Sequence, residues 1–450
     1  MSKKTTPASP PAATQTTAGY RAWVLAMLFI VYAFNFLDRQ IISILAIPIQ
    51  DELGLTDRQL GLLGGIAFAA LYSTLGVPIA WLADRKSRTW IITVSLVLWS
   101  GFTAVSGTVQ NFWQLFFARV GVGVGEAGGV APSYSLIADY FPPEKRARAL
   151  ALYSLGIPIG SAFGVIAGAM IAGGVVSDNL DWRAAFLMVG IAGIVIAPIF
   201  KLTVREPARG GLDKAAPTAE EIPADPVETS VPSAASPSFF AVLALLAKKP
   251  SFWFLTFGAT FSSMMGYGSF FWLPSFFARS FGIGIVETGL LFGTVLFIGG
   301  SLGILLGGII GDRLGAGKKS AYAIVPAIAF FLAFPLYVAG ILAPSPVIAV
   351  FLFIIPTGLG LAWLGPTLSA FQHLAPPNMR AMASATFLLI NNLLGIGIGI
   401  YVLGELSTIL QPAFGDNSLR YSVMIGASLY VVAGLLFLMA SRTLAKDWEK

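Results

Sequence analysis

Four ionisable residues lie within long apolar stretches in the first half of the chain: Asp38, Arg39, Arg119 and Glu126. An ionisable side chain near the middle of a bilayer costs at least about 2.5–3.5 kcal/mol, so it usually faces a polar cavity and serves a function. Arg119 and Glu126 are two helical turns apart and therefore share one helix face. Asp38 lies at a depth between them when positions are counted from the same membrane surface.

The two carboxylates are suited to proton exchange. Burial disfavours the charged form of a carboxylate and a nearby guanidinium favours it, so access of water or substrate can change its protonation near neutral pH. We therefore assign proton coupling to Asp38 and Glu126, with Arg119 as a charge partner. The alternative is a fixed salt-bridge network that only holds two helices together, although apolar packing often serves that purpose as well.

Arg39 adjoins Asp38 and points about 100° away from it around the helix. A guanidinium binds a phosphate or carboxylate well through two parallel hydrogen bonds, so Arg39 is a candidate for substrate binding. Equally, it could pair with another acid or extend to the membrane surface. The sequence leaves these alternatives open.

Composition argues against several other kinds of site. The chain has no cysteine and a single histidine, His373, so we expect neither disulfides nor a metal site. Its Gly-x-Gly sequences follow no predicted strand and precede no Gly-Lys-Ser/Thr, so they do not indicate an ATP-binding loop. No nucleophile–base pair accompanies the buried acids, so a membrane-embedded enzyme acting on lipid is only a remote alternative. We expect no catalytic residue, metal or cofactor.

Membrane-spanning helices must position these residues. Hydrophobic residues make up 56% of the 450 residues and charged residues only 11%, whereas an ordinary soluble domain has about 25% charged residues. A bilayer-crossing helix needs roughly 20 mostly apolar residues. Such runs predict an all-α integral membrane protein with twelve spans, at 21–49, 58–82, 89–108, 111–138, 147–173, 183–202, 250–278, 286–311, 320–342, 346–373, 380–408 and 418–442.

The twelve spans form two related halves. Asp84-Arg85 ends the second span and Asp312-Arg313 the eighth, and similar sequences beginning Pro142-Pro143 and Pro376-Pro377 precede the fifth and eleventh spans. Repeated halves are common in secondary transporters. The predicted organisation is a disordered tail (1–19), a first six-helix bundle (20–202), a flexible linker (203–238), an interfacial helix (239–249), a second six-helix bundle (250–443) and a second tail (444–450).

Lysine and arginine predict the orientation, because cytoplasmic loops are enriched in both. With both termini, both tails and the linker in the cytoplasm, the opposite side carries few basic residues: Arg58, Arg183, Arg279 and Arg420. Short hydrophilic loops and the absence of cysteine favour a bacterial inner membrane. Basic residues placed in this way set topology and do not indicate nucleic-acid binding.

Several motifs resemble the major facilitator superfamily. Gly308-x-x-x-Asp312-Arg313-x-Gly315 is similar to its loop after the second span of each half, from which the first half departs at Ala80 and Ser87; Arg119-x-x-x-Gly123-x-Gly125-Glu126-Ala127 is similar to its fourth span. A narrower resemblance, to spinster-like transporters, is carried by Asn35-Phe36-Leu37-Asp38-Arg39, Ile157-Pro158-Ile159-Gly160-Ser161, Arg205-Glu206-Pro207 and Lys249-Pro250-Ser251-Phe252. Animal members of that branch are associated with the export of sphingolipids or lysophospholipids. The resemblance implies that spans one and four are neighbours around a cavity, which would bring Asp38, Arg119 and Glu126 together.

Charged residues at the predicted cytoplasmic helix ends form a possible latch between the halves. The set is Asp84, Arg85, Arg88, Asp139, Arg146, Asp312 and Arg313. Rocking of two bundles requires contacts that form on one side of the membrane and break on the other, and ionic helix-end contacts of about 0.3–2 kcal/mol suit that role. The alternative is that these charges only set topology.

The spans of the second half contain no Asp, Glu, Lys or Arg in their interiors. They offer side chains that we expect to line the cavity: Tyr267, Phe271, Trp272, Trp363 and Asn391. A cavity charged on one wall and apolar on the other suits an amphiphile with an ionic head. The sequence therefore predicts a monomeric, proton-coupled secondary transporter of an amphiphilic or anionic organic solute, with a lysolipid or sphingolipid-like molecule as one candidate. The alternative is a transporter of small carboxylates or phosphate esters.

Overall fold

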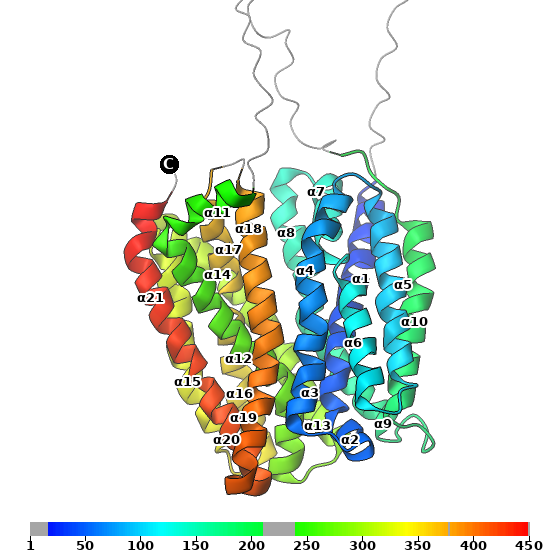
Figure 1. The fold of residues 1–450 in the computed structure, drawn as a ribbon. Coiled ribbons are helices and arrows are strands. Elements are labelled where there is room, and N and C mark those ends of the chain that lie inside the picture. The colour runs from blue at the N-terminus through cyan, green and yellow to red at the C-terminus, as the bar shows by residue number, and fades with distance from the viewer. Residues whose placement is uncertain (1–16, 210–238, 377–378, 449–450) are drawn as a thin grey trace, which may run out of the picture.

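The computed structural model describes residues 17–209, 239–376 and 379–448, and within these ranges the chain folds into helices without a strand. Figure 1 shows two groups of roughly parallel helices that lie side by side, α1 to α10 and α12 to α21. The all-α fold with two bundles is thereby confirmed.

Six spans make up the first half, and four of them consist of two helices in series. Gly128 and Gly129 lie where the fourth span is interrupted, since glycine is a poor helix former. In chain order the spans are α1 (Ala18–Ile44) with α2 (Ala46–Leu53), α3 (Asp57–Gly64) with α4 (Ile66–Ala83), α5 (Arg88–Ser106), α6 (Phe112–Glu126) with α7 (Val130–Tyr140), α8 (Pro143–Ser154) with α9 (Gly156–Ala172), and α10 (Trp182–Thr203).

Six further spans make up the second half, preceded by the short helix α11 (Phe239–Ala247). Two spans contain a π-helical segment, named η1 and η2. In chain order the spans are α12 (Pro250–Phe281), α13 (Ile285–Val295) with η1 (Leu296–Gly300) and α14 (Ser301–Gly317), α15 (Ala321–Ile341), α16 (Pro346–Leu361) with α17 (Leu364–Gln372), α18 (Arg380–Ile390) with η2 (Asn391–Ile398) and α19 (Gly399–Phe414), and, after η3 (Gly415–Asn417), α20 (Ser418–Ala427) with α21 (Leu429–Asp447).

Length and hydropathy support this count of spans. Nine helical stretches in the described ranges are long and apolar enough to cross a membrane, and one of them, Met382–Asp447, contains both of the last two spans. The two predicted spans outside these stretches are the interrupted α6–α7 pair and α12, which is rich in serine and aromatic residues. The twelve-span architecture therefore fits the structure.

The two ends of the bundle differ in how the halves meet. We call the end where α1 begins, α21 ends and α11 lies the terminal face, and the opposite end, with α2 and α20, the distal face (Figure 1). Toward the distal face, the second span packs directly on the eleventh, through α3 with α19 and α4 with η2. Glycine permits this approach: a Cβ at Gly65 would lie 2.4 Å from the carbonyl oxygen of Gly397.

The terminal face holds two segments that lie outside the spans. Helix α11 stands where the sequence predicts an interfacial helix, and its Val242 and Leu246 are fully buried against the second half. Residues 203–209, predicted as the start of a flexible linker, are bound to the first half instead: Arg209 Nη2 donates to the carbonyl oxygens of Ala83 (2.6 Å) and Lys86 (2.9 Å). Residues 210–238, the rest of the predicted linker, lie outside the described residues.

Candidate functional site

A cavity of about 430 Å³ lies between the two halves. Its lining extends toward the terminal face, to Ala80 near the end of α4 and Ser384 near the start of α18. The first half contributes Arg39 and several tyrosines, whereas the second half contributes mainly apolar and hydroxyl side chains. Principal lining residues are Tyr32, Phe36, Arg39, Tyr72 and Tyr134 on one wall and Ser262, Tyr267, Phe270, Trp363, Phe387, Asn391 and Asn392 on the other.

Three of the five predicted lining residues, Tyr267, Trp363 and Asn391, line this cavity. Phe271 instead lines a separate pocket of about 20 Å³ on the seam between the halves. The prediction for Trp272 is wrong: its indole is fully buried and donates to the carbonyl oxygen of Ile400 (2.9 Å). Neighbouring residues on a helix point in different directions, so the aromatic run in α12 presents only part of its length to the cavity.

The four ionisable residues of the first half form one buried cluster. Arg39 Nε donates to Glu126 Oε2 at 2.6 Å, and the Thr103 hydroxyl donates to Asp38. Asp38 is 2% exposed, Glu126 0% and Arg119 1%, and all four charged groups interact electrostatically with one another. Of the four, only Arg39 lines the cavity. The acids therefore meet the cavity through Arg39, which pairs with an acid while remaining accessible to a ligand.

Aromatic rings surround the Arg39 guanidinium. Its central carbon lies 4.9 Å from the ring centroid of Phe36, 4.7 Å from Phe68 and 4.4 Å from Tyr72. Such rings attract a cation electrostatically, most strongly where water is excluded. They hold the guanidinium at the cavity wall without occupying all of its hydrogen-bond donors.

Several polar atoms of the cluster are buried without a hydrogen-bond partner in the described ranges. They are Asp38 Oδ1, Arg39 Nη2, Arg119 Nε and Nη1, and Glu126 Oε1. Leaving a buried polar group unpaired costs about 1–3 kcal/mol, and more for a charged group. A network that served only to join helices is expected to match its donors and acceptors, so this arrangement favours a working site over a purely structural one.

Small residues position the helices that carry the cluster. A Cβ at Gly160 of α9 would lie 2.1 Å from the carbonyl oxygen of Ala33 in α1, and one at Gly123 of α6 would lie 2.3 Å from that of Phe68 in α4. Any larger side chain would force these helices apart. The glycines therefore allow the first, second, fourth and fifth spans to pack closely enough for Arg39 to reach Glu126.

Ion pairs join the two halves at the distal face. Arg279 of α12 donates from Nη1 and Nη2 to Asp57 of α3 (2.8 and 2.7 Å) and from Nη2 to Gln50 Oε1 (2.7 Å). The Ser407 hydroxyl of α19 donates to the same carboxylate (2.6 Å). We call this Asp57–Arg279 group, together with the Arg58–Glu405 pair, the distal latch.

The Arg58–Glu405 pair is the more exposed part of the latch. Arg58 Nη2 donates to Glu405 Oε1 at 2.7 Å, and the side chains are 49% and 25% exposed. This latch was not predicted from the sequence, whose charged helix ends instead indicated one at the opposite face. The available signal was the presence of Arg58 and Arg279 among the few basic residues on the distal side. Each of them pairs with an acid of the other half.

Comparison with known proteins identifies the fold. The family model described as Major Facilitator Superfamily matches residues 28–400. This chain belongs to the Major Facilitator Superfamily. It is an integral membrane transporter of that superfamily.

The more specific relatives are spinster homologues and an efflux pump. An MFS-type efflux pump of Mycolicibacterium smegmatis is 29% identical over 429 residues, covering 95% of this chain and 94% of the pump. Human protein spinster homolog 1 is 28% identical, covering 94% of this chain and 81% of its own length. A crystal structure of a bacterial homologue of the human lysosomal transporter Spinster, inward-facing and unoccupied, superimposes with a TM-score of 0.83 at 29% identity, covering 97% of this chain and all of that one. The spinster resemblance read from the motifs is confirmed.

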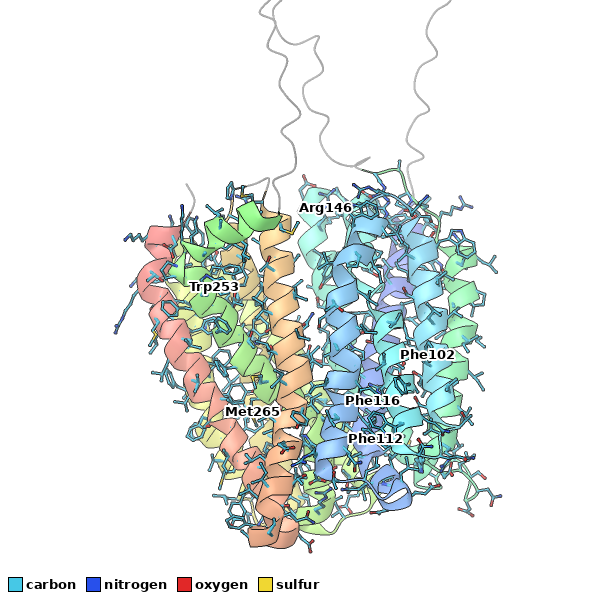
Figure 2. The ribbon with its side chains drawn as sticks, in the orientation of Figure 1. Phe102, Phe112, Phe116, Arg146, Trp253 and Met265 are labelled. Atoms are coloured by element: carbon cyan, nitrogen blue, oxygen red, sulfur yellow. The ribbon has the colours of Figure 1, made fainter. Side chains whose placement is uncertain are left out.

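The terminal-face charges of this superfamily member make contacts of a different kind from those predicted. Arg85 donates to the carbonyl oxygen of Trp81 (3.2 Å) and lies over its ring, and Asp84 ends α4. Arg146, at the terminal end of the first half (Figure 2), donates to the carbonyl oxygens of Ala138 and Phe141. Arg313 is exposed, and the side chain of Asp312 lies outside the described residues.

Arg88 is the centre of a buried network within the first half. Its guanidinium is 1% exposed and bonds to Asp139, to Ser135 (2.8 Å) and to Glu206 (2.7 Å). Glu206 also accepts from the backbone N–H of Thr89 at the start of α5 (2.9 Å), where a helix N-terminus favours negative charge. These contacts join the third and fourth spans to residues 203–209 and fix the segment that leaves the sixth span.

We expect the attachment of residues 203–209 to weaken in acid. Burial opposes ionisation of Glu206, but hydrogen bonds from Thr89, Arg88 and Ser87 outweigh it and hold its pKa below the ordinary value of 4.5. A group whose pKa is lowered on folding stabilises the structure above the unfolded value, and the contribution is lost as pH falls through the folded value. Backbone hydrogen exchange at 203–209, corrected for its intrinsic pH dependence, should therefore accelerate below about pH 4.5.

Glu206→Gln should exchange faster at neutral pH and lose most of this acid dependence, whereas Glu144→Gln, at an exposed position in α8, should behave as the wild type. Equal acid dependence in the wild type and Glu206→Gln would contradict this account of the attachment.

Proposed function

We propose that this chain is a proton-coupled secondary transporter of an anionic amphiphile, working as a monomer by alternating access. The observation that supports this proposal most directly is the position of Arg39. Its side chain lines the cavity, its buried Nη2 has no hydrogen-bond partner in the described ranges, and its Nε donates to the buried acid Glu126. A lysolipid or sphingolipid-like molecule is one candidate substrate, as the motif resemblance to spinster-like transporters implies. The membrane is a bacterial inner membrane with the terminal face in the cytoplasm, so the conformation described here is open to the inside.

Proton coupling follows because the anionic head group of the substrate and the Glu126 carboxylate compete for the Arg39 guanidinium. An anionic head that pairs with Arg39 draws it away from Glu126, and a buried carboxylate without its partner is neutralised by taking a proton. Release of the anion restores the Arg39–Glu126 pair and expels the proton. Asp38, held by Thr103 and close to Arg119, is the second acid through which the proton passes.

The cavity wall formed by the second half explains why the proposed substrate has an apolar part. Tyr267, Phe270, Trp363 and Phe387 present apolar surface, and Arg39 is the only charged residue among those that line the cavity in the described part of the chain. Ligand cavities of about 300–1,000 Å³ bury most of a drug-sized molecule. A head group at Arg39 therefore places an attached chain against the second half.

Binding of decyl phosphate tests the assignment of Arg39. Glu126→Gln should keep or raise the affinity, because it removes the negative charge that competes with the phosphate for the guanidinium, and it serves as the control. The double variant Arg39→Gln/Glu126→Gln carries no unpaired charge at this contact and should bind decyl phosphate about ten- to a hundredfold more weakly, since a hydrogen bond to a charged group contributes about 1.5–3 kcal/mol. Decanol should bind both variants equally.

Equal affinity of the two variants for decyl phosphate would refute the role of Arg39. Butyl phosphate binding as tightly as decyl phosphate would favour the alternative, a small organic-anion transporter. Uptake into proteoliposomes under an imposed pH gradient then separates transport from binding alone.

A further inference from the structure

The cavity is asymmetric in a way that the repeat of the two halves does not explain. Among the described residues of the first half, those that line the cavity include none from the third span (α5) or the sixth (α10). In the second half, the corresponding ninth and twelfth spans contribute Tyr337 of α15 and Tyr430 of α21. Helix α21 packs on α12, and α15 packs on α16. The cavity therefore extends past α12 and α16, the inner layer of the second half, and reaches the outer layer that contains α15 and α21.

Small residues create this branch. A Cβ at Gly360 of α16 would lie 2.4 Å from Tyr430 Oη, so only glycine at this position leaves room for the tyrosine hydroxyl. Ser262 and Gly266 of α12 line the same cavity, and the Ser262 hydroxyl donates to the carbonyl oxygen of Gly360 (3.3 Å).

The branch is lined with hydroxyl groups. Four side chains supply them, and we call the set the hydroxyl pocket: Ser262, Tyr337, Thr357 and Tyr430. Tyr337 is 0% exposed and its Oη has no hydrogen-bond partner in the described ranges. The hydroxyls of Thr357, Ser269 and Tyr430 lie near this Oη, but in the described ranges none of them meets hydrogen-bond geometry. Because a buried tyrosine hydroxyl nearly always finds a partner, this one is available to a ligand that enters the branch.

We propose that the hydroxyl pocket is a second subsite, which binds a neutral hydrogen-bonding group on the apolar part of the substrate, at a distance from the head group held by Arg39. This inference rests on the proposed function, because it adds a second contact to the same ligand. It narrows the substrate class from any anionic amphiphile to one whose chain carries a hydroxyl, carbonyl or similar group. The Tyr337 hydroxyl donates to that group or accepts from it.

Paired probes test the subsite, with binding measured on protein in nanodiscs and on empty nanodiscs. Decyl phosphate is compared with its analogue that carries a hydroxyl at the far end of the chain. The wild type should bind the hydroxylated member about three- to tenfold more tightly, the usual contribution of one hydrogen bond. In Tyr337→Phe the ratio should fall to about one.

Tyr322→Phe is the matched control, since Tyr322 lies on the same helix α15 but stacks on Trp448 and does not line the cavity. A wild type that does not distinguish the two probes, or a Tyr337→Phe variant that keeps the preference, would overturn the subsite.

A neutral pair, decanol and decanediol with a hydroxyl at each end, separates this inference from the proposed function. If neither phosphate binds but decanediol is preferred over decanol through Tyr337, the anionic class fails and the hydroxyl pocket stands. If the phosphates bind through Arg39 but no hydroxylated probe is preferred in either pair, the proposed function stands and the hydroxyl pocket fails.

Discussion

Replacing Glu126 with glutamine is expected to abolish proton-driven accumulation of substrate in proteoliposomes. With one proton carried per substrate and no membrane potential, a gradient of one pH unit supports about tenfold accumulation, because one pH unit corresponds to about 1.4 kcal/mol. Glutamine keeps an oxygen that can accept from Arg39 Nε but has no proton to exchange. The accumulation ratio should therefore fall to about one while exchange of substrate across the membrane continues.

Asp38→Asn supplies the companion experiment. We expect it to reduce accumulation as well, since Asp38 shares the buried cluster with Glu126 and Arg119. Thr103→Val removes the hydroxyl that donates to Asp38 without changing any charge, and serves as the control for packing. If both acid variants fold normally and accumulate substrate as the wild type does, the coupling mechanism is wrong.

Truncating Arg279 is expected to open the distal face. The side chain makes two bonds to Asp57 and one to Gln50, all between halves. Removal of one partner of a hydrogen-bonded charge pair typically costs about 2–5 kcal/mol. Only the conformation in which the latch is closed contains this pair, so only that conformation is destabilised. Arg279→Ala should therefore shift the population toward a state open at the distal face by at least about tenfold.

A cysteine reporter measures this shift, because the natural chain contains no cysteine. Ile396 is 3% exposed and lines the small pocket on the seam, so Ile396→Cys should react slowly with an impermeant maleimide applied from the distal side. When Arg279→Ala is added to the Ile396→Cys variant, the maleimide should label the cysteine faster. Arg58→Ala should accelerate labelling less, since exposed ion pairs contribute about 0–1 kcal/mol.

Arg183 provides the matched control for the distal latch. It is also an arginine on the distal side paired with an acid, but Arg183 and Glu52 both belong to the first half. Trp182 Nε1 and Arg183 Nη1 both donate to the Glu52 carboxylate (2.6 and 2.5 Å). Arg183→Ala should leave labelling of Ile396→Cys unchanged. Equal acceleration by Arg183→Ala and Arg279→Ala would show that general destabilisation, not the latch, controls opening.

Much of the fold could be predicted from the sequence because the bilayer imposes a simple rule. Apolar runs of sufficient length become spans, and the charges inside them stand out against that background. Asp38, Arg119 and Glu126 could thus be assigned to one cluster before the structure was known, with the superfamily resemblance supplying the proximity of the first and fourth spans. The structure brings all three together with Arg39.

Contacts that depend on helix rotation or on docking of the halves could not be predicted. Whether Arg39 pairs with Glu126 is decided by the rotation of α1 relative to α6, which periodicity alone does not give. The same limit separates Tyr267, which lines the cavity, from Trp272, which does not. The distal latch requires the relative position of two bundles, and charges near helix ends fit a topological role equally well until that position is known.

One measurement tests the central claim most directly: the pH inside proteoliposomes when decyl phosphate is added outside with no gradient imposed. If an anion at Arg39 displaces Glu126 and so brings a proton with it, wild-type vesicles should acidify inside as the substrate enters, and Glu126→Gln vesicles should not. Substrate entry into wild-type vesicles without any change of internal pH, or equal acidification by Glu126→Gln, would contradict the account.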